Sequence, residues 1–89
     1  MNKLKELHLK IDEINSKILN LIVKRNQIVK KIGKHKKEKN LPIYNLKREK
    51  EIYNKMEISA KRKGINRKFI RKLFGLILKQ SKGVDKNVQ

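Results

Sequence analysis

Apolar residues recur every three or four positions along the first third of the chain. They form one set, called the heptad stripe here: Leu4, Leu7, Ile11, Ile14, Ile18, Leu21, Ile28 and Ile32. Steps that alternate between three and four residues place side chains on one face of an α-helix. Because no proline precedes Pro42, the pattern predicts one uninterrupted helix from roughly Lys3 to Lys39.

A helix of that length has a consequence for assembly. At a rise of ~1.5 Å per residue it spans about 50 Å, whereas a compact domain of this chain length has a radius of gyration of only ~12 Å. The rest of the chain is too short to cover the whole heptad stripe. We therefore expect a second copy to cover it, in an intertwined homodimer or a larger helical bundle.

Turn and cap residues divide the rest of the chain into two shorter helices. Pro42 disfavours helix at the residue before it, and Asn45 is a good N-cap for a helix from roughly Leu46 to Lys63. Gly64 is a typical C-terminal stop. Asn66 is then the N-cap of a third helix.

The third helix carries an apolar stripe of its own, formed by Phe69, Ile70, Leu73, Phe74, Ile77 and Leu78. We expect Gly83 to fray or end this helix, with a mobile tail after it. The predicted fold is all-α, with three helices and a very long first helix, in one domain over residues 1–89.

Charge narrows the choice of partners. The 89 residues include 26 Lys or Arg and 8 Asp or Glu, a formal net charge of +18. Such a chain attracts nucleic acid, membrane surfaces or small polyanionic substrates. Two features argue against nucleic acid: only 4% of the residues are aromatic, and the basic residues are spread over the whole chain rather than gathered on one element.

Other classes are excluded by what the sequence lacks. There is no cysteine, which excludes disulfides and thiolate metal sites. His8 and His35 are too far apart for a zinc motif. No apolar run approaches the ~18 residues of a membrane span, and the basic N-terminus lacks the apolar stretch of a signal peptide. We expect a cytoplasmic protein with no membrane and no metal partner.

One position interrupts the heptad stripe. The step after Leu21 reaches Arg25, a cation on the apolar face. One interpretation is a polar residue that sets the register or extends out of the bundle to water. The other is an anion site inside the bundle, because a buried cation without a partner is costly.

The order of several residues across nearly the whole chain carries a resemblance to a known family. These residues are Arg25, Gly33, Lys36, Pro42, Arg48, Glu49 and Ser81. With this order and spacing the chain resembles the all-helical, type II chorismate mutases. The resemblance implies an intertwined homodimer of three helices per chain, with two active sites that each use both chains. It also implies the rearrangement of chorismate to prephenate, in phenylalanine and tyrosine biosynthesis, without metal, cofactor or covalent intermediate.

The resemblance further implies roles for the cationic and acidic residues. Chorismate has two carboxylates, an ether oxygen and a ring hydroxyl, and its catalyst holds the compact diaxial conformer while stabilising negative charge on the ether oxygen. By similarity, Arg25 binds a carboxylate. Lys36 contacts a carboxylate and the ether oxygen, and Glu49 accepts a hydrogen bond from the ring hydroxyl.

Three further residues belong to the implied site. Arg48 shapes the substrate pocket, Ser81 bonds the ring carboxylate, and Asn45 stands where the family often has aspartate. Each site residue also has a purely structural interpretation. Lys36 is one of many lysines around it, Arg48 and Glu49 suit a surface ion pair, and Ser81 suits a helix end.

Three positions depart from the family pattern: Asn15, which lies away from the proposed chemistry, and His8 and Asp85, which belong to the implied site. His8 stands where the family has an arginine that reaches into the partner's site, and a neutral imidazole carries no charge. Asp85 stands where the family has Gln or Glu that donates to the ether oxygen, and an ionised aspartate only accepts. If these residues act as donors, both need a proton. We therefore expect weaker activity than is typical of the family, decreasing as pH rises. The alternative for His8 is a surface residue without a role.

Three other functions remain open at this point. An isochorismate pyruvate-lyase has the same fold, although Glu49 directly after Arg48 favours a mutase. A non-catalytic basic helical dimer could bind nucleic acid. A degenerate module could bind a larger enzyme of the shikimate pathway.

Overall fold

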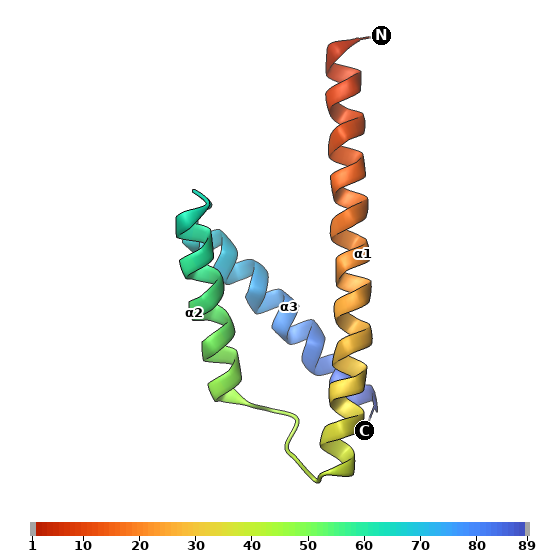
Figure 1. Cartoon of the computed structure of the whole chain (residues 1–89), viewed down its shortest axis with the longest axis vertical. Helices are drawn as coiled ribbons and strands as arrows, with labels where there is room; N and C mark the ends of the chain where they lie inside the picture. Colours follow the sequence, from red (N-terminus) through yellow and green to blue (C-terminus); the bar gives the residue numbers. More distant parts are fainter. Residues whose placement is uncertain (1, 89) are drawn as a thin grey trace.

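A computed structural model describes residues 2–88 of the chain. Over this range it contains three helices and no strand: α1 (Lys3–Glu38), α2 (Leu46–Arg62) and α3 (Arg67–Val88) (Figure 1). The prediction of an all-α fold with a very long first helix is confirmed. The ends of α1 and α2 differ from the predicted ends by one residue.

An asparagine begins each helix. The side-chain Oδ1 of Asn2 accepts a hydrogen bond from the Leu4 amide at 2.8 Å. Asn45 accepts one from the Arg48 amide at 3.0 Å, and Asn66 caps α3 in the same way. These bonds satisfy backbone amides that have no partner inside the helix. The two caps predicted from the sequence, Asn45 and Asn66, are therefore confirmed.

Left-handed residues end α1 and α2. Asn40 has φ 54° and Gly64 has φ 72°, a region that asparagine and glycine enter at least cost. After each of them the chain bonds back to the helix, through the Leu41 amide to the Lys36 carbonyl at 2.8 Å and in the same pattern after Gly64. The end of α1 thus comes from Asn40, two residues before Pro42.

The expectation that Gly83 ends the third helix is wrong. α3 continues through Gly83 to Val88, because a glycine inside a helix costs only about 1 kcal/mol. Val84 is half-buried, and Asp85 is 5% exposed and paired with α1. These contacts on the next two residues hold the last turns in place. The position of Gln89 lies outside the described residues.

α3 is the element that joins the other two helices. In Figure 1 it runs diagonally from the C-terminal end of α2 to the C-terminal half of α1, and it packs against both. Over the described residues, α1 and α2 do not pack against each other. The N-terminal part of α1 extends beyond both shorter helices, which gives the chain an extent of 57 × 26 × 15 Å.

A single chain buries very little apolar surface. Among the described residues, the buried apolar side chains are Ala60 and Leu78. All eight residues of the heptad stripe are exposed, by 44% to 63% of their surface. The radius of gyration is 16.6 Å, above the ~12 Å of a compact domain of this length. Within the described range, no helix has the length and hydropathy needed to cross a membrane.

Gly64, in the turn between α2 and α3, and Gly83, inside α3, predict opposite effects of a substitution by alanine. A Cβ at Gly83 meets no atom within 4 Å, so Gly83→Ala raises the free energy of unfolding by about 0.5–1 kcal/mol through helix propensity. Gly64→Ala lowers it by about 1 kcal/mol, because alanine is strained at positive φ. Thermal and urea unfolding of the two variants measure both effects. Equal signs would contradict the assigned backbone at one of the two positions.

Candidate active site

A cavity of about 340 Å³ lies between the C-terminal half of α1, the start of α2 and the C-terminal half of α3. Its apolar walls are formed by Val29, Ile32, Ile43, Ile52 and Leu78. Its polar and charged lining is formed by Arg25, Lys36, Asn45, Arg48, Glu49, Ser81, Lys82 and Asp85. The structure therefore brings together seven of the eight residues predicted for the site, and it adds Lys82.

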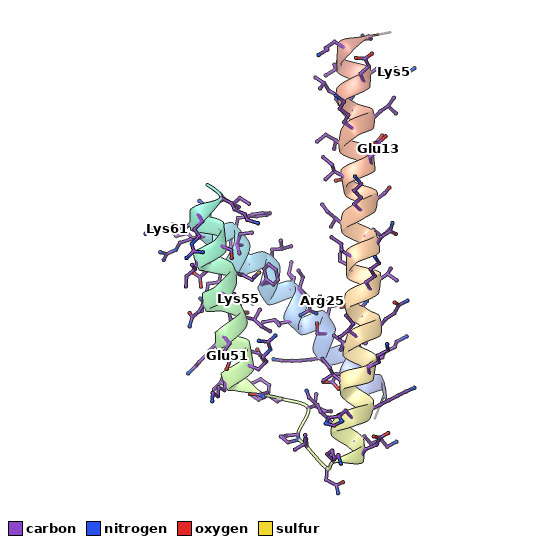
Figure 2. The ribbon with its side chains drawn as sticks, in the orientation of Figure 1. Lys5, Glu13, Arg25, Glu51, Lys55 and Lys61 are labelled. Carbon is purple, nitrogen blue, oxygen red and sulfur yellow. The ribbon has the colours of Figure 1, made fainter. Side chains whose placement is uncertain are left out.

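Arg25 is directed from α1 toward α3, as Figure 2 shows. Its guanidinium donates a hydrogen bond to Ser81 Oγ, and this hydroxyl donates to the Ile77 carbonyl at 2.9 Å. Among the described residues, no carboxylate lies within ion-pair distance of Arg25. Arg25 therefore lines the cavity between α1 and α3, and its role as a ligand for an anion stays a prediction.

The electrostatic environment of Arg25 favours an anion. Burial lowers the pKa of its guanidinium, and the nearby charge of Arg48 lowers it further. An arginine nevertheless stays protonated at neutral pH. Two cations that lie close together without a carboxylate between them are unfavourable, so an anionic ligand bound there would relieve the repulsion.

Lys36 is the most constrained of the cations. Its ammonium donates to Asp85 Oδ2 at 2.9 Å and to the Ile43 carbonyl at 2.7 Å. The side chains of Lys36 and Asp85 are only 19% and 8% exposed, so water screens their attraction weakly. Lys36 therefore joins α1, the segment before α2 and α3 at one point.

The carboxylate of Asp85 is only half satisfied. One oxygen accepts from Lys36, whereas the other, Oδ1, is buried and has no hydrogen-bond partner. A buried acceptor without a donor costs about 1–3 kcal/mol. Asp85 thus lines the cavity as predicted, with one oxygen that a proton or a ligand donor would satisfy.

The start of α2 supplies three polar residues to the cavity. Asn45 caps the helix, and this cap fixes the first turn, from which Arg48 and Glu49 project. Arg48 and Glu49 have different partners: Arg48 lies 3.5 Å from exposed Glu51, and Glu49 lies 3.1 Å from Lys82. The alternative interpretation, a surface pair of Arg48 with Glu49, is therefore not the arrangement found.

Lys82 was not predicted as a site residue. It follows Ser81 on α3, and its ammonium lies 3.1 Å from Glu49 Oε2 and 4.5 Å from the centre of the Tyr44 ring. In the sequence it is one lysine among many. The one available signal was its position directly after Ser81, a predicted site residue. Four cations and two carboxylates line the cavity, which leaves a local surplus of two positive charges.

His8 does not lie at this cavity. It is exposed and lies between Lys5 and Glu13, on the part of α1 that extends beyond the other helices (Figure 2). At ~1.5 Å per residue, about 25 Å of helix separate it from Arg25. Within one chain, His8 therefore makes no contribution to the site. Among the described residues, there is no group of three or more histidine or acidic side chains that could hold a metal ion.

Comparison with known proteins places these observations in a family. A family model described as chorismate mutase type II matches residues 7–86. A chorismate mutase of Methanocaldococcus jannaschii is 34% identical over 86 residues, which are 97% of this chain and 87% of that protein. A bifunctional chorismate mutase/prephenate dehydratase of Aquifex aeolicus is 45% identical over 56 residues, which are 63% of this chain and 16% of that protein.

A solved structure agrees with the sequence comparisons. A conserved hypothetical protein of Pyrococcus furiosus has the same fold with a TM-score of 0.73, at 39% sequence identity. The match covers 96% of this chain and 97% of that one. The helices, the cationic cavity and the match over residues 7–86 lead to one conclusion: this chain belongs to the type II chorismate mutase family.

Proposed function

We propose that the chain is an isomerase that rearranges chorismate to prephenate, a step in the biosynthesis of phenylalanine and tyrosine. The observation that carries the proposal is the surplus of two positive charges in a partly apolar cavity. Chorismate has two carboxylates and a hydrophobic ring, so its charge and its shape both suit such a site. Family membership and the matched chorismate mutases support the same activity.

We assign one carboxylate of the substrate to Arg25, a cation without an acidic partner in the cavity, and the other to Ser81. Arg25 binds one carboxylate through its planar fork, which suits bidentate contact. Ser81, which already accepts from Arg25, bonds the ring carboxylate. Arg48 shapes the opposite wall, and Asn45 holds the turn that carries it. These contacts hold the compact diaxial conformer, in which the bond-forming carbons are close.

Lys36 is the residue that we assign to the transition state. The rearrangement breaks the ether bond while a carbon–carbon bond forms, and negative charge develops on the ether oxygen. An ammonium already fixed in a poorly hydrated cavity stabilises that charge without reorganisation. Glu49 accepts the hydrogen bond of the ring hydroxyl. The reaction proposed is therefore one of positioning and electrostatic stabilisation, and no step transfers a proton to or from carbon.

Asp85 competes with the substrate for Lys36. While Asp85 is ionised, its Oδ2 holds the ammonium at 2.9 Å, and its negative charge opposes charge on the ether oxygen. A proton on Asp85 weakens its hold on Lys36 and creates a donor beside the cavity. The buried Oδ1 accepts no hydrogen bond, so a proton can bind to this oxygen without displacing another donor.

We propose that the active unit is a homodimer. The exposed heptad stripe and the very small core of a single chain support this assembly. Burial of apolar surface stabilises association by roughly 25 cal/mol per Å². Pairing of the long helices would also carry His8 toward the site of the partner chain. The cytoplasmic location expected from the sequence stays a prediction.

The activity is tested by following the absorbance of chorismate and the appearance of prephenate with the purified chain. Arg25→Met is expected to lower kcat/KM by about 100-fold or more, because the substrate is then no longer held in the reactive geometry. Its melting temperature is expected to stay equal or to rise, because a desolvated cation near Arg48 is removed. Arg62→Met, at the exposed end of α2, is the matched control.

Lys36→Ala also removes turnover, but it leaves Asp85 buried without its partner, so a loss of stability accompanies it. Arg25→Met is the cleaner variant for that reason. Full turnover in Arg25→Met would contradict the assignment of this cavity. Release of pyruvate from isochorismate, without prephenate formation from chorismate, would identify a lyase.

The pH dependence tests His8, and a substitution tests Asp85. Since an imidazole carries a charge only when it is protonated, kcat/KM is expected to fall as pH rises from 5 to 9 if His8 acts in the partner's site. Asp85→Asn keeps the shape of the side chain and donates at every pH, so it should raise kcat/KM, because it removes a negative charge that opposes charge on the ether oxygen. His8→Arg, which is always charged, should raise kcat/KM at pH 8. A flat profile for the unchanged chain would remove His8 from the mechanism.

The homodimer is tested by sedimentation analysis. The unchanged chain should sediment as a dimer, whereas Ile18→Glu, in the heptad stripe, should dissociate it and lower helicity and activity together. Burying one unpaired carboxylate in each chain costs several kcal/mol. Ser16→Glu, on the opposite face of α1, adds the same charge and should leave the dimer intact. A monomeric and fully active unchanged chain would contradict the proposed assembly.

A further inference from the structure

Lys82 lies in the cavity but outside the set of residues that carries the family resemblance. It is on α3, directly after Ser81, and it lines the cavity together with Glu49. Its ammonium lies 3.1 Å from Glu49 Oε2. The interaction joins α3 to the first turn of α2, so it crosses the cavity rather than running along one helix.

Tyr44 restricts the position of the lysine. The ammonium of Lys82 lies 4.5 Å from the centre of the Tyr44 ring, a distance at which a cation is attracted to an aromatic face. Tyr44 belongs to the segment just before α2, next to the cap residue Asn45. The ammonium is thus held between an aromatic ring and a carboxylate, and both come from the same short stretch of chain.

The partners of this ion pair differ in exposure. The Glu49 side chain is 17% exposed, whereas the Lys82 side chain is 45% exposed. Glu49 lies inside the cavity and Lys82 lies toward its rim. A carboxylate in that position needs a fixed orientation if one oxygen is to receive a hydrogen bond from a ligand. With Oε2 bound to Lys82, the other oxygen, Oε1, is free to turn toward the ligand.

We propose that Lys82 is a positioning residue, which holds the Glu49 carboxylate in the orientation that accepts the ring hydroxyl of the substrate. This inference rests on the proposed chorismate mutase function. Lys82 acts through Glu49 and makes no contact of its own with the substrate. It also cancels the charge of Glu49, so that a carboxylate can lie in the cavity without repelling a dianionic substrate.

The test uses three single variants of the whole chain. Lys82→Met keeps the length of the side chain and removes the charge. It should lower kcat/KM for chorismate roughly tenfold, as expected when the substrate hydroxyl loses its hydrogen bond to the charged Glu49. Lys82→Arg keeps the charge and should stay within about threefold of the unchanged chain. Lys79→Met removes a charge from the exposed side of α3, outside the cavity, and corrects for the general electrostatic attraction of substrate.

A double-mutant cycle separates positioning from direct contact with substrate. In the background of Glu49→Gln, Lys82→Met should change kcat/KM by less than twofold, because the residue through which it acts is already altered. A chorismate analogue without the ring hydroxyl should likewise respond little to Lys82→Met in the otherwise unchanged chain. A tenfold loss that persists in the Glu49→Gln background, or with that analogue, would overturn the proposal.

The outcomes distinguish this inference from the proposed function. If the unchanged chain turns over chorismate and Lys82→Met behaves like Lys79→Met, the role of Lys82 is wrong and the function stands. If the unchanged chain does not turn over chorismate, the function is wrong and the role of Lys82 falls with it. Melting temperatures of all variants show whether a loss of activity follows from a loss of folding.

Discussion

The ammonium of Lys36 is the point on which the arrangement of this chain depends. It bonds Asp85 at 2.9 Å and the Ile43 carbonyl at 2.7 Å, so it connects the end of α1 to α3 and to the segment that leads into α2. The chain has almost no apolar core to hold these elements together. A weakly screened ion pair is therefore a large part of what positions the last turns of α3 and the residues that α3 presents to the cavity.

The same interaction connects fold and chemistry. A lysine that is already fixed and poorly hydrated costs little to use in a transition state, but a carboxylate bound to it lowers its availability. The departure from the family pattern at Asp85 thus has two effects, one on the attachment of α3 and one on the charge in the cavity. The remaining positive charge of the chain, much of it exposed, attracts a dianion from a distance, with a strength that salt reduces.

The parts of the fold that local chemistry decides could be predicted from the sequence. The heptad stripe predicted α1, Asn45 and Asn66 predicted helix starts, and Gly64 predicted a helix end. The continuation of α3 past Gly83 could not be predicted, because the buried pair of Asp85 with a residue 49 positions away outweighs the preference of glycine. Local propensity is weak beside a tertiary contact of this kind.

In the site, too, some residues could be predicted from the sequence and others could not. Seven of its residues followed from their order along the chain, since the resemblance compares residue types at fixed spacings. Lys82 had no such signal: its importance depends on the distance to Glu49 and on the Tyr44 ring, and a chain with 26 Lys or Arg offers many equivalent lysines. The pairing of Lys36 with Asp85 could not be predicted either. A resemblance gives the residue types at a site, and it does not give the hydrogen bonds that these residues make in the absence of substrate.

The small core of the single chain has a consequence for how the protein behaves on dilution. If a second copy covers the heptad stripe, most of the apolar burial of the native state belongs to the contact between chains and not to either chain alone. Unfolding and dissociation are then one equilibrium governed by mass action. The temperature at which half of the chains are folded would rise with total protein concentration, and enzyme held at very low concentration would lose its structure along with its partner.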